Sequence, residues 1–278
     1  MAMPYLRALP DRDLVRAAAQ GSKPYTGMAE RTGWVDHIPV IWVEPDAGPA
    51  PVALWLPPFS TNKEWALPFL NELAGAGFLA VSFDPWQHGE RGTESSEEMR
   101  GRVFGAFRRH MWPILGQTAL DALRVLDHFG SDDVVAGGVS MGGDVAVALA
   151  GIDRSVRRVA TIVSTPDWTR PGMRDLMDPS QDLPQGEADG YAQWFYEQLD
   201  PLTHPDRYAR GQAILFECGG DDRHVPADGA LRFAETVGDS VRVNVRPGLG
   251  HMDAMTPDVL KSCLGWLRTG FRSRDGRT

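Results

Sequence analysis

The chain has 278 residues, of which 42% are apolar and 23% are charged, the composition of an ordinary globular protein. Its net charge of −9 argues against nucleic acid or an anionic membrane surface as a partner. Two cysteines, Cys218 and Cys263, are too few for a disulfide framework and lack the spacing of zinc ligands.

Residues 1–20 mix arginines and aspartates among short apolar groups, which is not the pattern of a signal peptide. The chain also contains no uninterrupted run of about 18 apolar residues, the length that a membrane-spanning helix needs. We therefore expect a soluble, cytoplasmic protein. The sequence does not indicate an oligomeric state.

Apolar runs and helical patterns alternate along the chain. Two short strands at 33–35 and 40–43 come first, followed by a turn rich in proline and glycine. Apolar runs then predict strands at 52–56, 78–83 and 134–139, and further strands are predicted at 159–163, 213–217 and 241–245. Between and after them, helices are predicted at 64–76, 113–129, 142–151, 227–237 and 257–268.

Strands that are apolar throughout are buried on both faces, and strands separated by helices form parallel sheets. We predict one α/β domain over residues 1–278, with a mostly parallel, doubly wound sheet and an antiparallel start. Residues 164–208 separate two strands by far more chain than a crossover requires. We interpret this segment as a small helical cap inserted over the strand ends.

The motif from Gly138 to Gly143 lies where a buried strand ends and a helix begins. Small residues flank Ser140, as a sharp strand-to-helix turn requires, and such a turn exposes the serine hydroxyl above the sheet. A hydroxyl is a weak nucleophile until a base removes its proton, and the base needs a carboxylate to orient it. His251 follows the last strand, and the adjacent acids Asp221 and Asp222 follow the strand before it.

These residues stand in the order serine, acid, histidine, and the chain resembles the α/β-hydrolases. Within that superfamily it is similar to bacterial carboxylesterases related to dienelactone hydrolases and to prolyl-oligopeptidase catalytic domains. The resemblance covers about residues 50–270. It rests also on residues 56–64 (LPPFSTNKE), 84–92 (DPWQHGERG), 200–202 (DPL) and 220–226 (GDDRHVP). In the family the orienting acid stands four residues before the proline, which favours Asp222 over Asp221.

The resemblance implies an oxyanion hole with two backbone donors. The N–H of Met141 supplies one donor by its position after the nucleophile. Pro57 and Pro58 replace the family's usual His-Gly, and proline has no N–H to donate. The second donor is therefore expected to be Phe59, with Ser60 as the alternative.

Four side chains are candidates for the substrate pocket, although each also has an ordinary packing or loop-ordering interpretation. His88 lies on a loop expected near the site, and Trp112 belongs to an apolar stretch at 103–112. Trp168 and Trp194 belong to the predicted cap. Ligand sites are mostly apolar with few polar anchors, which favours such residues as walls.

We expect a serine hydrolase that cleaves a small or medium carboxylic ester through an acyl-enzyme, with no metal or organic cofactor. Its partner would be a small-molecule ester. The alternatives are a thioesterase or an amide- or peptide-cleaving enzyme on the same fold, because fold does not fix function. A ligand-binding protein without activity is a further alternative, which a complete set of three residues argues against.

Overall fold

The structure is a computed structural model and describes residues 29–46, 50–130, 132–209 and 211–269. The expectation about a leader sequence at 1–20 lies outside these ranges. One sheet contains β1 (Glu30–Val35), β2 (Ile38–Val43), β3 (Val52–Leu56), β4 (Leu79–Phe83), β5 (Val134–Val139), β6 (Val156–Ile162), β7 (Ala213–Gly219) and β8 (Val241–Arg246).

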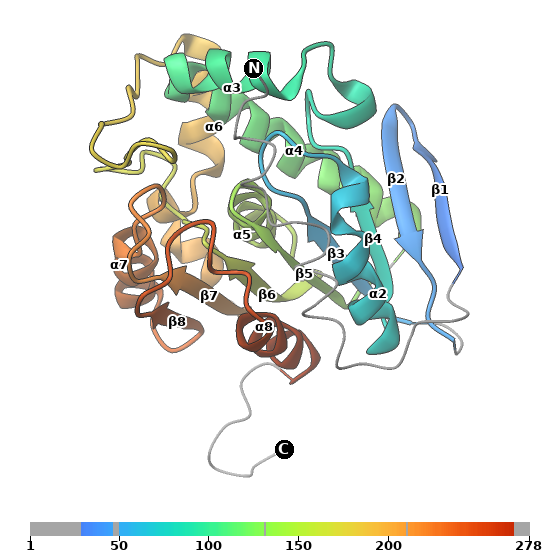
Figure 1. The fold of residues 1–278 in the computed structure, drawn as a ribbon. Coiled ribbons are helices and arrows are strands. Elements are labelled where there is room, and N and C mark those ends of the chain that lie inside the picture. The colour runs from blue at the N-terminus through green and yellow to red at the C-terminus, as the bar shows by residue number, and fades with distance from the viewer. Residues whose placement is uncertain (1–28, 47–49, 131, 210, 270–278) are drawn as a thin grey trace.

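The strands are ordered β1-β2-β4-β3-β5-β6-β7-β8 in the sheet (Figure 1). β1 pairs antiparallel with β2, and β2 pairs antiparallel with β4; every other pair is parallel. The predicted fold class, a mostly parallel sheet with an antiparallel start, is confirmed. The chain reverses its direction of travel across the sheet after β4, so a topological switch point lies between β3 and β5.

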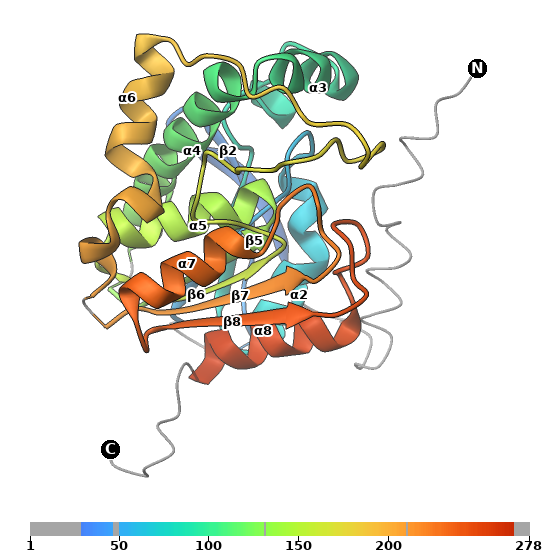
Figure 2. The same ribbon diagram turned by 90° about the vertical axis from the view of Figure 1, so that its left-hand side faces the viewer.

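Helices cover both faces of this sheet (Figure 2). One face is packed by α2 (Leu67–Gly75) and α8 (Pro257–Thr269) through a core that includes Phe69, Leu70 and Trp266. The opposite face carries the larger core and is covered by α4 (Phe107–Phe129), α5 (Met141–Ile152) and α7 (Asp228–Val237), and α6 (Gly190–Leu199) packs against α4 and α5. Burial on both sides explains why β3 and β5 are apolar at every position but glycine.

Two helical boundaries differ from the sequence prediction. α4 begins at Phe107 rather than at Pro113, which lies inside the helix. An interior proline removes one backbone hydrogen bond, but the added turns bury Phe107, Met111 and Trp112 almost completely. A short 3-10 helix, η2 (Lys63–Ala66), precedes α2 where a single helix was expected.

α3 (Ser96–Gly105) was not predicted, although the sequence carries its start signal. Ser95 accepts a hydrogen bond from the Glu98 N–H, and the Glu98 carboxylate accepts one from the Ser95 N–H. This reciprocal pair is a capping box, readable as serine followed three residues later by glutamate.

The segment at 164–208 contains α6 and two short 3-10 helices, η4 (Pro201–Thr203) and η5 (Pro205–Tyr208). α6 packs against α4 and α5 rather than against the sheet directly. Of the helices in the described ranges, none has the length and apolar character needed to cross a membrane.

Candidate active site

The switch point brings two loops together at the carboxyl ends of β3 and β5. Leu56, the last residue of β3, is paired in register with Gly138 of β5. Ser140 therefore lies two residues past this pair on one strand, and Phe59 lies three residues past it on the other. Open parallel sheets bind ligands in the crevice at this position.

Ser140 occupies the sharp turn that the motif predicts. Its φ of 52° and ψ of −120° lie in a region that L-residues rarely adopt. It directly precedes α5, and its carbonyl accepts hydrogen bonds from the N–H groups of Gly143 and Asp144. Side chains would not fit around this turn, because a Cβ on Gly142 would lie 2.2 Å from the Leu56 carbonyl oxygen.

The structure joins Ser140, His251 and Asp222 by hydrogen bonds. The Ser140 hydroxyl lies 3.1 Å from Nε2 of His251, and Nδ1 of His251 lies 2.7 Å from Oδ2 of Asp222. A carboxylate at Nδ1 fixes the neutral ring as the Nδ1–H tautomer, so Nε2 carries the lone pair that accepts from the serine hydroxyl. We call this arrangement the serine–histidine–aspartate relay.

The acid of the relay is Asp222 and not its neighbour. Asp222 is buried, and its second oxygen accepts hydrogen bonds from the backbone N–H groups of His224 and Val225 at 2.9 and 2.8 Å. Asp221 is exposed, and its N–H donates to the Leu249 carbonyl. The loop therefore holds one carboxylate rigidly against the histidine and leaves the other facing solvent.

Met141 and Phe59, the expected oxyanion donors, lie on the two loops that meet beside Ser140. Within the described residues, no group accepts a hydrogen bond from the N–H of either residue. The close approach of Gly142 to Leu56 and Pro57 presses the serine turn against the Phe59 loop. The role of both N–H groups remains a prediction that this geometry accommodates.

Two of the four candidate pocket residues contact each other. Trp112 stacks on Tyr196 with ring centroids 4.4 Å apart and donates its indole N–H to the Trp168 carbonyl. Trp168 is wholly buried, whereas Trp194 on α6 is 51% exposed. Trp112 and Trp168 thus pack the 164–208 segment onto α4, and the roles of all four in substrate binding stay predictions.

His88, the fourth candidate, belongs to a row of aromatic rings that ends at the relay. Its ring contacts Phe59, Phe59 contacts Phe104, Phe104 contacts His224, and His224 contacts His251, with centroids 5.0–5.7 Å apart. Burial lowers the pKa of His88 to about 4 and that of His224 to about 3. Both rings are therefore neutral near pH 7.

Two members of this row were missed or set aside at the level of sequence. His224 lies only two residues after Asp222 and does not contact Ser140, but its ring lies directly against His251. Phe104 was part of the apolar stretch at 103–112 without being singled out. Only the tertiary placement of α3 shows that Phe104 stands between Phe59 and His224, whose ring in turn contacts His251.

The sequence does not indicate a buried ion pair that lies next to the serine turn. Asp144, one helical turn after Ser140, contacts the guanidinium of Arg170 and accepts a 2.7 Å hydrogen bond from the Thr165 N–H. Both charged side chains are at most 4% exposed. The pair ties the start of the 164–208 segment to α5.

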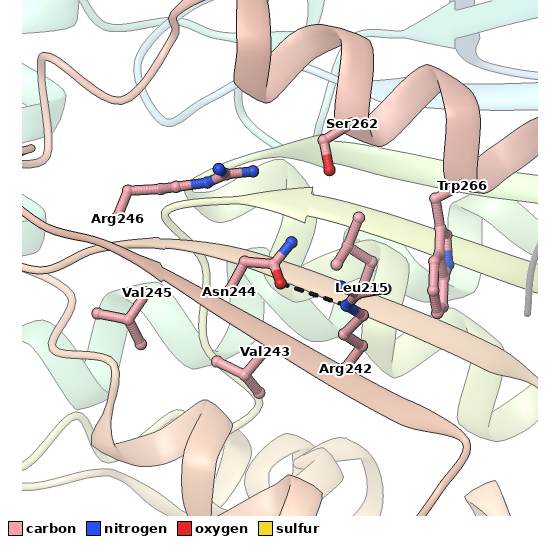
Figure 3. A pocket seen from close by; sticks show the side chains of 8 residues that line it. All are labelled: Leu215, Arg242, Val243, Asn244, Val245, Arg246, Ser262 and Trp266. Carbon is pink, nitrogen blue, oxygen red and sulfur yellow. Dashed lines mark hydrogen bonds between the residues drawn. The ribbon is translucent and has the colours of Figure 1, made fainter.

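A separate hollow of about 490 Å³ lies between β8 and α8 (Figure 3). None of the three relay residues lines it. Three of its polar side chains, Asn244, Arg246 and Ser262, are hydrogen-bonded to the buried carboxylate of Glu217. These bonds give the polar lining a structural role. Among the described residues, no cluster of three or more histidines, cysteines or acids could hold a metal ion.

No protein-family model and no curated protein matches the chain. Solved structures do. TT1662 from Thermus thermophilus is 23% identical with a TM-score of 0.67, and the match covers 90% of this chain and 100% of that one. A putative dienelactone hydrolase from Klebsiella pneumoniae is 13% identical with a TM-score of 0.62, covering 88% of this chain and 100% of the other.

A puromycin-hydrolyzing peptidase from Mycobacterium tuberculosis is 15% identical with a TM-score of 0.65. The match covers 91% of this chain but only 41% of the peptidase. Identities this low establish architecture and leave activity to be argued from the site. With its strand order, its serine turn after β5 and these structural matches, the chain has the α/β-hydrolase fold.

Proposed function

We propose that this protein is a serine hydrolase that cleaves a small or medium carboxylic ester through an acyl-enzyme. The observation that carries the proposal is the unbroken relay from Ser140 through His251 to Asp222, with contacts of 3.1 and 2.7 Å. The base lies within hydrogen-bonding reach of the hydroxyl, as proton abstraction requires. Its orienting carboxylate is buried and fixed by two backbone N–H groups.

In the first half-reaction, Oγ of Ser140 attacks the ester carbonyl carbon while Nε2 of His251 takes the hydroxyl proton. The carbonyl oxygen becomes an oxyanion that accepts hydrogen bonds from the Met141 and Phe59 N–H groups. Asp222 stabilises the imidazolium that forms. The bond from carbon to the alcohol oxygen then breaks, and the imidazolium gives its proton to the departing alcohol.

In the second half-reaction, water takes the place of the alcohol. His251 removes a proton from water as its oxygen attacks the acyl carbon, and the same two N–H groups hold the oxyanion. The bond between the acyl carbon and Oγ breaks, and the proton returns to Ser140. The acid is released and the relay is restored, so the cycle uses only side chains and backbone of this chain.

A second candidate is cleavage of an amide or peptide bond. The observation in its favour is the similarity to the puromycin-hydrolyzing peptidase, whose fold this chain shares over 91% of its length. The same relay would protonate a leaving amine instead of an alcohol. A thioester is a third substrate that the relay would accept.

A fluorophosphonate probe and a substrate panel test the proposal. Wild type should be labelled and Ser140→Ala should not, because only an activated serine reacts with the probe. Para-nitrophenyl esters of rising acyl length, matched thioesters and matched anilides would then rank the three substrate classes. Absence of labelling would indicate a ligand-binding protein without activity, and faster anilide than ester turnover would favour the peptidase alternative.

A further inference from the structure

Asp84 is a carboxylate buried at the carboxyl end of β4, beside the switch point. Its side chain is fully buried and accepts three hydrogen bonds from two different loops. Oδ1 accepts from the Lys63 N–H at 2.8 Å, and Oδ2 accepts from Lys63 Nζ at 3.2 Å and from the Glu90 N–H at 2.9 Å. One side chain therefore joins the start of η2 to the loop that follows β4.

Lys63 is the cation that makes this burial tolerable. Its side chain is only 3% exposed, and Nζ also lies 2.6 Å from Glu90 and 2.9 Å from Glu64. Burial by itself lowers the pKa of Lys63, but the bonds to Glu90 and Glu64 and the charge of Asp84 raise it above its usual value. A buried ion pair persists only when its remaining polar atoms are satisfied, as they are in this cluster.

The loop after β4 is shaped to receive the Asp84 carboxylate. Gly89 has a φ of +54°, and a Cβ at this position would lie 2.3 Å from the Asp84 carboxyl group. No side chain fits there, so the glycine permits the close approach of the Glu90 N–H. Arg91 extends the cluster by donating to the Asp84 carbonyl and pairing with the buried Asp121.

The cluster fixes one end of the segment that contains Phe59. At the other end, Leu56 is held in β3 and lies against Gly142 of the serine turn. The six residues between Leu56 and Lys63 include Ser60, whose φ of 60° is left-handed. Its carbonyl accepts from the Ser96 hydroxyl at 2.9 Å. Contacts with Asp84, which follows β4, and with Ser96 of α3 therefore hold this segment in place.

We propose that Asp84 is a positioning residue that sets the place of the second oxyanion donor, the Phe59 N–H, through Lys63. This inference rests on the proposed hydrolase function. Pro57 and Pro58 have no N–H, so no preceding residue of the loop could replace Phe59 if the loop shifted. The contact between Asp84 and Lys63 holds the loop rigid, as a preorganised oxyanion donor requires.

Asp84→Asn tests the proposal because it keeps the size of the side chain. The amide NH2 group replaces one carboxylate oxygen, so a donor then faces a backbone N–H and one hydrogen bond is lost. We expect kcat for a para-nitrophenyl ester to fall about 10- to 100-fold, less than the roughly 100- to 1000-fold lost when an oxyanion donor is removed outright. KM should change by less than about threefold, since the donor acts on the transition state. A boronic acid that forms a tetrahedral adduct on Ser140 should bind about tenfold more weakly.

Glu217→Gln is the matched control. Glu217 is also a fully buried carboxylate with an ion pair and several hydrogen bonds, but its partners lie on β8 and α8. We expect this variant to lose stability with kcat and boronate affinity close to those of wild type. A general effect of removing a buried charge would instead lower kcat in both variants, and that result would overturn the positioning role.

Wild-type turnover and its loss in Ser140→Ala first establish whether the proposed function holds. If both are seen, and folded Asp84→Asn keeps kcat within about threefold, the positioning role is refuted while the hydrolase function stands. If Asp84→Asn does not fold, Glu90→Gln decides. It removes an exposed carboxylate from Lys63 and should lower kcat about three- to tenfold; an unchanged kcat would overturn the proposal.

Discussion

The neutral, buried His224 predicts how stability depends on pH. Its Nδ1–H donates to the Arg174 carbonyl, and its ring contacts Phe104 and His251. Burial lowers its pKa from 6.5 to about 3, and the nearby charges of His251 and Arg170 act in the same direction. In the unfolded chain the same imidazole titrates near its ordinary value.

The sign follows from which state binds the proton. Between pH 6.5 and about 3, unfolded His224 is protonated while folded His224 is not, so stability falls as the pH falls. Above pH 6.5 the His224 imidazole is neutral in both the folded and the unfolded state, so it causes no loss of stability there. Each pH unit below that value removes about 1.4 kcal/mol. At pH 5 the loss from this one residue is therefore roughly 2 kcal/mol relative to pH 8.

His224→Asn isolates this contribution, because Nδ2 of asparagine can keep the bond to the Arg174 carbonyl but does not titrate in this range. Urea unfolding followed by tryptophan fluorescence gives the free energy of unfolding at pH 8 and pH 5. Wild type should lose about 2 kcal/mol more than the variant between these pH values. His37→Asn, in an exposed turn, should behave as wild type. A difference between wild type and His224→Asn that is equal at both pH values would refute the reasoning.

The other predictions concern catalysis and are measured by steady-state kinetics with para-nitrophenyl esters. Asp222→Asn should lower kcat by about 10⁴ through loss of the correct tautomer, whereas Asp221→Asn should change it little; the reverse ranking would move the acid to Asp221. Phe104→Ala should raise kcat/KM for long acyl chains about tenfold relative to kcat/KM for short ones, because it adds space to the acyl pocket. An unchanged ratio would show that this ring does not line the pocket. Gly142→Ala should lower kcat at least about 100-fold by displacing the oxyanion loop, and Gly101→Ala, with open space around its Cα, should not; wild-type kcat in Gly142→Ala would contradict the geometry.

The relay could be predicted from the sequence because its members depend on strand order alone. Ser140, Asp222 and His251 each follow a parallel strand, and parallel strands deliver their carboxyl ends to one edge of a sheet. Strand order does not distinguish Asp221 from Asp222, because both follow the same strand. Residue spacing before Pro226 favoured Asp222, and the physical reason is that its carboxylate caps the N–H groups of residues 224 and 225.

The surroundings of the relay could not be predicted in the same way. Between residues 164 and 189 the chain forms no helix of its own, so no periodic pattern indicates where Trp168 points. Its burial depends on contacts with α4, whose first turns were also missed because Pro113 suggested a later start. Side-chain direction in irregular segments is set by tertiary packing, which a single sequence does not encode locally.

The strand order also explains how a loop with two prolines is held beside the serine turn. β3 lies between β4 and β5, so the loop after β3 is flanked by Asp84 on one side and by the serine turn on the other. Gly142 lies against the first residues of this loop, and the Asp84 carboxylate binds the N–H of Lys63 at the end of the loop. Backbone position is thus imposed from both neighbouring strands. Substitutions at Pro57 or Pro58 should therefore matter less for the Phe59 N–H than substitutions at Asp84 or Gly142, which are farther away in sequence.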